Sequence, residues 1–297
     1  MKLHKPAIVA AGLLWGLMGL FVRNLSVRGY SSEDIVIVRS GVAALLYAAM
    51  MLAQDRNLFR VKPRDFWCFF GSGIVSMLFF TYCYYSTIKL TSMSTAAILL
   101  YTSPAFVMLL SLFVFREKMT ANKLIALVIV IVGCALSSGL GSGSAISLKG
   151  LLFGLGSGIG YALYSIFAAL AMQRGYDSRT VSFYSTLLAA IGACILWGGK
   201  EPAMLMFSSG TDILWCISLG IVTCFLPYLF YTYGLSKVEP GTASIMVAVE
   251  PCMATVAGFV LFHETLSFTT GLGVLLVVAA IVILNLPDQN AAQKPSE

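Results

Sequence analysis

The chain alternates between ten long apolar stretches and short breaks that contain charged residues, proline or glycine. Each stretch is close to the length of about 20 residues at which an α-helix crosses a bilayer. A transmembrane β-barrel would instead alternate apolar and polar residues along each strand. The pattern therefore predicts ten transmembrane helices, over residues 7–25, 35–53, 66–88, 92–115, 122–139, 150–172, 180–198, 212–235, 241–262 and 268–286.

The overall composition excludes a soluble fold. Of the 297 residues, 59% are hydrophobic and 11% are charged, with a mean hydropathy of +0.89. A soluble domain carries about 25% charged residues, so this chain has too few charges to cover a surface that faces water. The apolar run after the N-terminus resembles a signal peptide, but since more spans follow it, we interpret it as a retained first helix.

Neither cysteines nor glycines indicate a cofactor. The seven cysteines lie inside apolar stretches, without a Cys-x-x-Cys pair or an adjacent histidine. They are typical of small buried hydrophobic residues, so the sequence predicts no metal site and no disulfide framework. The glycine-rich run from Gly150 to Gly160 lies within a span and follows no strand, which favours a helix-packing face over a nucleotide loop. Gly12 and Gly16 repeat this pattern in the first span.

The second half of the sequence repeats the first at an offset of 146 or 147 residues. We place the first repeat at 1–139, a Gly/Ser-rich linker at 140–149, the second repeat at 150–287 and a cytoplasmic tail at 288–297. The clearest matches are Arg28-Gly29-Tyr30 with Arg174-Gly175-Tyr176, Thr95-Ala96 with Thr242-Ala243, Pro104 with Pro251, and Glu117 with Glu264.

An odd number of spans in each repeat fixes how the halves are related. After five spans the second repeat enters the bilayer from the opposite side, so a pseudo-two-fold axis in the membrane plane relates the halves. This is the plan of many secondary transporters, which bind substrate near the midplane between the repeats. The predicted fold class is an all-α membrane protein with ten transmembrane helices as two inverted five-helix repeats.

The distribution of basic residues predicts the orientation. Thirteen Lys and Arg residues lie on the side of both termini, five lie on the other side, and Arg39 lies inside a span. The positive-inside rule then places both termini in the cytoplasm, in a multi-pass protein of the cytoplasmic (inner) membrane. Although the net charge is +6, the basic residues lie in short connectors, which argues against a nucleic-acid partner. The partners we expect are the lipid bilayer and a small-molecule substrate, for a monomer or a homodimer.

Two charged residues inside spans are the first candidates for substrate binding. Glu250 lies near the middle of the ninth span, and Arg39 lies about one turn into the second. Charges within a membrane are costly and are functional by default. Glu250 is suited to a cationic group or a coupling proton, or else it is a protonated group that holds the bundle together. Arg39 is suited to a carboxylate or phosphate, or else its side chain snorkels outward. If both face one cavity, they suit a zwitterion such as an amino acid.

Prolines and symmetric acids mark candidate gating positions. Pro104 and Pro251 each remove a helical hydrogen bond in mid-span and predict a break in the fourth and ninth helices. Glu117 and Glu264 form a symmetric pair at the ends of these spans. We expect them to pair with nearby bases, Arg116 or Lys118 in the first case, or to cap connectors, with anchoring favoured over gating.

Several aromatic side chains are candidates for an aromatic-lined pocket. Trp15 and Tyr101 lie deep in their spans, and Tyr161 is the repeat mate of Trp15. Such a pocket would favour a cationic or aromatic substrate through cation–π contacts. Tyr85 and Tyr231 are further candidates, but most tyrosines at 82–85 and 228–233 fit the belts that flank a bilayer.

Taken together, these residues resemble the EamA family of the drug/metabolite transporter superfamily. The features are Trp15-Gly16, Arg39, the run from Tyr101 to Glu117, and Glu250-Pro251. The resemblance covers nearly the whole chain and implies ten helices in inverted repeats around a central cavity. It also implies alternating-access movement of small metabolites, in many relatives export of amino acids and in some uptake of choline-like cations.

The predicted function is secondary transport of a small polar or charged metabolite by alternating access. Its coupling to protons through Glu250, its direction and its substrate stay open. A facilitative uptake transporter for choline-like quaternary ammonium compounds is the alternative. An enzyme is disfavoured because the two histidines lie at span ends and Glu250 is the one acid in mid-span. A channel is disfavoured because the polar positions form short spots rather than rings along a path.

Overall fold

The computed structural model describes residues 3–91, 93–137, 147–263 and 267–286. Glu264 and the predicted tail at 288–297 lie outside the described residues, as does most of the predicted linker at 140–149. The described part of the chain folds into helices and contains no strand.

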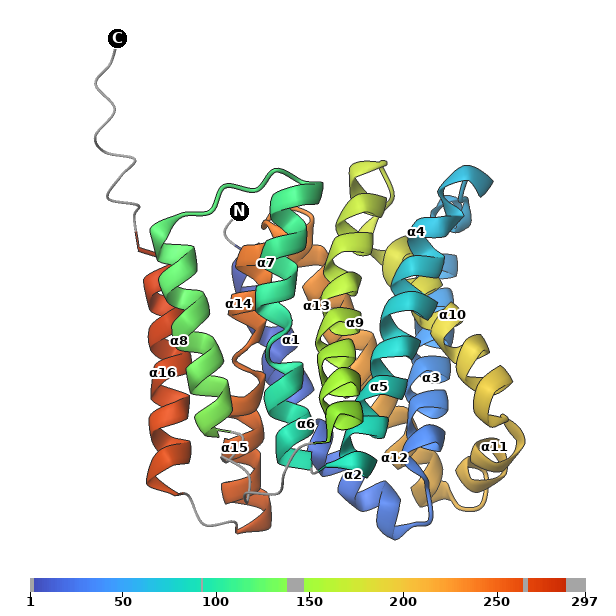
Figure 1. Ribbon diagram of the computed structural model, residues 1–297. Helices are drawn as coiled ribbons and strands as arrows, with labels where there is room; N and C mark the ends of the chain where they lie inside the picture. The colour runs from blue at the N-terminus through green and yellow to red at the C-terminus, as the bar shows by residue number, and fades with distance from the viewer. Residues whose placement is uncertain (1–2, 92, 138–146, 264–266, 287–297) are drawn as a thin grey trace.

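All ten predicted spans are helical over the residues that the structure describes, with ends close to those expected (Figure 1). Half of them are interrupted by a turn or by π-helical geometry. The first repeat contains α1 (His4–Gly16) and α2 (Met18–Val27), α3 (Ser32–Gln54), α4 (Phe66–Phe70), the π-helical η3 (Gly71–Leu78) and α5 (Phe79–Leu90), α6 (Met93–Leu100) and α7 (Ser103–Val114), and α8 (Ala121–Ser137). The second contains α9 (Leu148–Gln173), α10 (Ser178–Trp197), α12 (Gly210–Gly220), the π-helical η4 (Ile221–Phe225) and α13 (Leu226–Leu235), α14 (Pro240–Val247) and α15 (Glu250–Phe262), and α16 (Phe268–Leu284). Short helices η1 (Arg56–Phe59), η2 (Pro63–Asp65) and α11 (Lys200–Met206) lie between spans.

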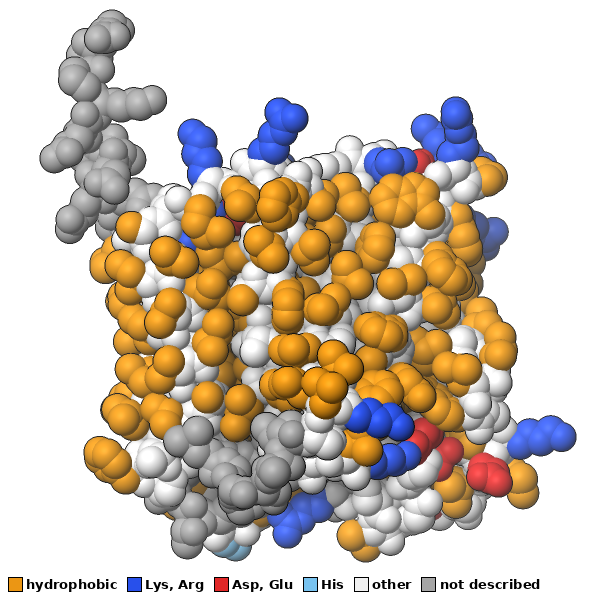
Figure 2. Space-filling model, in the orientation of Figure 1, with side chains coloured by type: hydrophobic (Ala, Val, Ile, Leu, Met, Phe, Trp, Pro, Cys, Tyr) orange, Lys and Arg blue, Asp and Glu red, His pale blue; other side chains and the backbone are white. Residues whose placement is uncertain are grey.

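The surface of the molecule matches a membrane environment. Within the part of the chain that the structure describes, eight helical segments are long and apolar enough to cross a bilayer, and α8 and α16 are shorter apolar helices. Hydrophobic side chains cover the lateral face in Figure 2, and the Lys and Arg side chains of that view gather at its upper and lower rims. Apolar side chains that face outward from a bundle are stable in lipid, so the protein is a multi-pass membrane protein.

The two repeats run in opposite directions. In Figure 1, α1 and α2 descend from the upper face, whereas their repeat mate α9 rises from the lower face. The start of α1 and the upper end of α16 lie at the same face. This is the inverted arrangement that five spans per repeat predict.

Helices of the two repeats interleave in the core. Helix α1 packs against α13 and α15, and the symmetry-related α9 packs against α5 and α7. Helix α3 packs against its own mate α10, and α8 against its mate α16. Each contact thus has a counterpart under the repeat symmetry, and both halves contribute to the same core.

Glycines allow the closest of these approaches. A Cβ atom on Gly12 would lie 2.6 Å from the carbonyl oxygen of Val247, and one on Gly16 would lie 2.5 Å from that of Glu250. In the other repeat, a Cβ atom on Gly158 would lie 2.9 Å from a side-chain oxygen of α6–α7. Small residues permit backbones to meet in this way, which confirms the helix-packing interpretation of both glycine runs.

An arginine and an aspartate from opposite repeats pair at each face. Arg28, which follows α2, lies 3.0 Å from Asp212 at the start of α12. Arg174, which follows α9, pairs with Asp65, whose carboxylate also accepts a hydrogen bond from Tyr176 at 2.8 Å. Because Arg174 is the repeat mate of Arg28 and Asp212 that of Asp65, these two Arg–Asp clasps are the same contact made twice.

Candidate functional site

Two broken helices meet the core at equivalent positions. Helices α6 and α7 are separated by Tyr101 and Thr102, and α14 and α15 by Ala248 and Val249, exactly one repeat offset later. Each new helix carries the predicted proline as its second residue, where a missing N–H costs no helical hydrogen bond. Discontinuous helices near the midplane are the usual frame of a transporter binding site. The breaks at Pro104 and Pro251 are therefore as expected, and their gating role stays a prediction.

Glu250 is the first residue of α15 and its carboxylate faces other helices. The hydroxyl of Tyr161, on α9, lies 3.5 Å from Oε2 of Glu250. Tyr84 and Tyr101 also interact electrostatically with this carboxylate. The side chain keeps part of its surface accessible although it lies in mid-span. Glu250 is thus a deep acid among tyrosines rather than a group that points into lipid.

Arg39, on α3, is a buried cation. Arg39 is only 5% exposed. Its Nη1 donates a hydrogen bond to the thioether sulfur of Met18 at 3.2 Å. Among the described residues, no hydrogen-bond acceptor reaches its Nε atom and no carboxylate forms an ion pair with it. The snorkelling alternative is therefore wrong, because the guanidinium is enclosed by protein.

Arg39 and Glu250 belong to the same polar region but do not neutralise each other. The two charges interact electrostatically, yet within the described ranges they form no ion pair with each other. Tyr85, which is partly accessible, interacts electrostatically with Arg39. The region thus offers a cationic end and an anionic end, with tyrosines at each.

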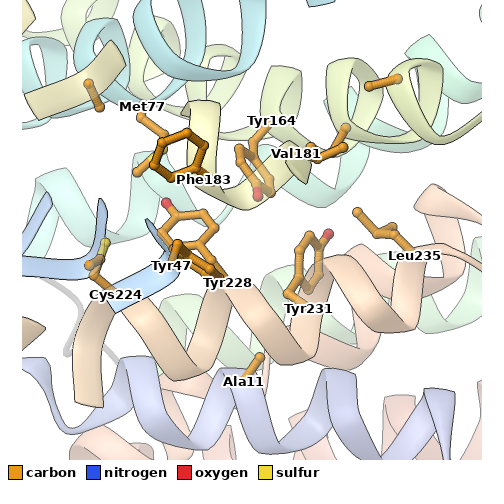
Figure 3. Packing of buried hydrophobic residues seen from close by; sticks show 14 of the residues in the cluster. Ala11, Tyr47, Met77, Tyr164, Val181, Phe183, Cys224, Tyr228, Tyr231 and Leu235 are labelled. Atoms are coloured by element: carbon orange, nitrogen blue, oxygen red, sulfur yellow. The ribbon is translucent and has the colours of Figure 1, made fainter. Parts of the chain in front are cut away.

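An aromatic cluster adjoins this region. The ring of Trp15 lies 6.3 Å from that of its repeat mate Tyr161, 5.2 Å from Tyr228 and 5.6 Å from Tyr231. Contact between the repeat mates Trp15 and Tyr161 indicates that the pseudo-two-fold axis passes close to them. Figure 3 shows Tyr164, Tyr228 and Tyr231 together in the packed core.

The tyrosines divide between core and membrane boundary differently from the sequence-based expectation. Tyr82 is 49% exposed, as an aromatic belt requires, whereas Tyr231 is 2% exposed and Tyr228 is also buried. The belt interpretation is therefore wrong for Tyr228 and Tyr231. The Tyr231 hydroxyl is hydrogen-bonded to Ser165 at 2.7 Å, and contact of Tyr231 or Tyr85 with substrate stays a prediction.

Glu117 joins two connectors on one face. It forms an ion pair with Lys123 at 2.7 Å, not with Arg116 or Lys118, and it accepts a hydrogen bond from the backbone of Gly241 at 3.2 Å. Lys123 also pairs with Glu239 at 2.6 Å. Glu117 therefore caps the start of α14, as one of the two predicted roles requires, while Glu264 lies outside the described residues.

Sequence reasoning missed one contributor to the site and undervalued another. Met18 carried no signal, because a methionine in an apolar span is ordinary. The sequence singles out Tyr161 only as the repeat mate of Trp15, although its hydroxyl donates a hydrogen bond to the Glu250 carboxylate. The repeat itself was the available signal, since mates near a two-fold axis must lie close together.

Comparison with known proteins places this chain in one family. The sequence model of the EamA-like transporter family matches residues 6–139 and again residues 148–286. An "uncharacterized transporter" of Archaeoglobus fulgidus is 28% identical over 95% of this chain and 96% of its own length. The uncharacterized inner membrane transporter YicL of Salmonella typhimurium is 21% identical over 96% of each chain.

A solved structure has the same fold. A crystal structure superposes with a TM-score of 0.80 at 17% sequence identity, and covers 97% of this chain and 98% of the other. The two matches to one family model span nearly all of the described residues. The chain belongs to the EamA-like transporter family and is a membrane transporter.

Proposed function

We propose that this transporter is a secondary carrier that moves a small zwitterion of the amino-acid class across the cytoplasmic membrane by alternating access. The observation that carries the proposal is the pair of deep, opposite charges at Arg39 and Glu250, which interact electrostatically but form no ion pair with each other. A zwitterion between them would satisfy both.

Each charge fits one end of such a substrate. The planar guanidinium of Arg39 matches a carboxylate by paired hydrogen bonds. The Glu250 carboxylate matches an ammonium group, and nearby Tyr84, Tyr101 and Tyr161 add rings that attract cations. The broken helices α6–α7 and α14–α15 supply free backbone groups near the same depth.

Because its guanidinium is buried and has no anionic partner among the described residues, Arg39 favours a zwitterion over a choline-like cation as substrate. A quaternary ammonium compound would use Glu250 and the tyrosines but would leave the buried guanidinium without an anion. Buried charges that lack a partner are strongly destabilising. A carboxylate-bearing substrate removes this cost, and a cation without an anionic group adds a second charge beside it.

Glu250 is also the group that we assign to coupling. A carboxylate that lies in mid-span and accepts a hydrogen bond from Tyr161 can carry either a proton or a substrate ammonium. Exchange of these two cations at one site would couple substrate movement to protons. Net movement of substrate down its gradient that changes internal pH in proteoliposomes would support this step, and net movement with no pH change would oppose it.

The test is a thermal-shift screen followed by transport. Purified protein is screened against amino acids, amines, quaternary ammonium compounds and nucleosides, and bound ligands stabilise it by RT ln(1 + [L]/Kd). We expect amino acids to stabilise the protein and to show saturable counterflow in proteoliposomes. Arg39→Gln and Glu250→Gln should each abolish counterflow, whereas the exposed controls Arg60→Gln and Glu201→Gln should leave it unchanged. Unimpaired counterflow in either site variant, or stabilisation by quaternary ammonium compounds alone, would overturn the proposal.

A further inference from the structure

The first span is broken at a point where its repeat mate is continuous. Helix α1 ends at Gly16 and α2 begins at Met18, whereas α9 runs without interruption over Leu148–Gln173. No proline lies at this break, and Leu17 instead closes a tight turn by donating its N–H to the carbonyl of Leu14 at 3.1 Å. Gly16 and Gly19 flank this turn, whereas the second repeat has Ala162 and Ser165 at the equivalent positions. Because glycine weakens a helix, the flanking glycines permit a break in the first span that α9 does not have.

The residue after the break is the one that contacts Arg39. Sδ of Met18 accepts the hydrogen bond from Nη1 of Arg39 at 3.2 Å. In the second repeat the equivalent positions hold Tyr164 and Ser185. The break and the buried arginine thus occur together in one repeat and are both missing from the other.

A thioether is a poor partner for a guanidinium. Its sulfur is a weak acceptor, while an arginine side chain has five N–H donors. Within the described residues, Nε of Arg39 has no acceptor at all. The Met18 contact is therefore readily replaced by any acceptor that carries a negative charge, since charge-assisted hydrogen bonds are about twice as strong as neutral ones.

We propose that Met18 holds the place of the substrate carboxylate on Arg39 and is displaced when the substrate binds. This inference rests on the proposed function, because it needs a substrate with a carboxylate. Displacement removes the Met18–Arg39 contact between α2 and α3, next to the point where the first span is interrupted. Met18 is thus a positioning residue that sets how strongly the site retains carboxylates.

The displaced residue is adjacent to the other half of the site. Gly16, two residues before Met18, lies so close to α15 that a Cβ atom on it would be 2.5 Å from the carbonyl oxygen of Glu250. Trp15 packs against Tyr161 and Tyr228. A change at the α1–α2 break therefore acts directly on the start of α15 and on the aromatic cluster, so occupancy of Arg39 is communicated to Glu250.

The experiment compares three substitutions at position 18 in the full-length protein. Met18→Leu keeps the size and removes the acceptor, Met18→Glu supplies a permanent carboxylate, and Met18→Gln is its neutral match in length. The first readout is thermal unfolding in nanodiscs with sodium acetate against sodium chloride at equal concentration. The second is counterflow of a mixture of the common amino acids in proteoliposomes.

For Met18→Leu we expect an about three- to tenfold lower half-saturation concentration, because the bound carboxylate no longer competes with the thioether. Acetate should also raise its melting temperature more than that of the unsubstituted protein. Met18→Glu should melt at a higher temperature than Met18→Gln, with counterflow abolished and no response to acetate. The stabilisation by Met18→Glu should disappear when Arg39→Gln is added.

The two proposals fail in different ways. If the unsubstituted protein transports no amino acid but the acetate and melting results appear as expected, the proposed function is wrong and the Met18–Arg39 assignment stands. If Met18→Leu has the original half-saturation concentration and acetate response, the assignment is overturned. It is overturned equally if Met18→Glu transports like the unsubstituted protein. Should Met18→Glu not fold, Met18→Leu alone decides.

Discussion

The two repeats make the same contacts at the rims of this molecule but carry different residues at its centre. At the rims, the Arg28–Asp212 and Arg174–Asp65 clasps are the same contact made twice, once at each face. At the centre, the repeat mate of Arg39 is Ser185, so the second repeat carries no equivalent arginine. Likewise Glu250 has Ser103 as its mate. Duplication thus accounts for the scaffold, and divergence accounts for the charges at the proposed site.

Each repeat contributes one of the two central charges. Arg39 comes from the first repeat and Glu250 from the second, and the α1–α2 break accompanies the arginine. A fully symmetric centre would carry like charges on both sides of the two-fold axis, and it would repel rather than bind a zwitterion. The asymmetry is therefore what permits a substrate with two different ends.

The largest effect is expected from making the centre symmetric. Arg39→Ser gives the first repeat the residue of the second, and Glu250→Ser does the same in the reverse direction. Each removes one charge-assisted contact of about 1.5–3 kcal/mol, so amino-acid affinity should fall about 10- to 100-fold. Binding by isothermal titration measures this. Matched substitutions at the exposed Arg60 and Glu201 should change nothing, and an equal loss there would show that the effect is not specific.

A smaller effect is expected at one of the close backbone contacts between the two repeats. Gly16→Ala places a methyl group against the carbonyl oxygen of Glu250, at 2.5 Å. Overpacking of this kind costs about 1–3 kcal/mol, so the melting temperature in nanodiscs should fall and transport should slow. Gly19→Ala is the control on the following helix, because nothing lies within 4 Å of its added Cβ. A Gly16→Ala protein as stable and active as Gly19→Ala would contradict the close contact between α1 and α15.

The smallest effect is expected at the clasps, and it should be the same at both. Side chains of Arg28 and Arg174 are 35% and 41% exposed, and ion pairs this accessible contribute about 0–1 kcal/mol. Asp65→Asn and Asp212→Asn should therefore lower the melting temperature slightly and by similar amounts, and their effects should add in the double variant. Thermal unfolding in nanodiscs checks this. A large loss for one aspartate alone would break the symmetry argued for the rims.

The sequence predicts how deep a residue lies in the membrane better than it predicts which way its side chain points within the helix bundle. The apolar stretches, the repeat and the prolines fix the ten spans and the breaks at Tyr101–Thr102 and Ala248–Val249, because these depend on local chemistry. The rotation of each helix depends on the partner that packs against it. For this reason the sequence favours a belt for most tyrosines at 228–233, with Tyr231 as a pocket candidate, whereas both Tyr228 and Tyr231 lie in the core.

The contacts that join distant segments escaped prediction for the same reason. Glu117 has three bases nearby in sequence, and only the packing of α8 against the α14 connector selects Lys123. Gly16 and Gly19 flank the turn at Leu17, but glycines in a span equally indicate a helix-packing face, and the contact between Met18 and Arg39 depends on how α2 packs against α3. The sequence alone identifies the charged residues and prolines that matter, but it does not identify the side chains that contact them.

The central claim is that Arg39 and Glu250 hold opposite ends of one substrate. The most direct measurement is isothermal titration of three ligands: the amino acid that exchanges best, its decarboxylated amine and its deaminated acid. Arg39→Gln should lose affinity for the amino acid and the acid but bind the amine at least as well as before, and Glu250→Gln should lose affinity for the amino acid and the amine but bind the acid at least as well as before. If both variants lose all three ligands equally, or if neither distinguishes the amine from the acid, the two residues do not divide the substrate between them.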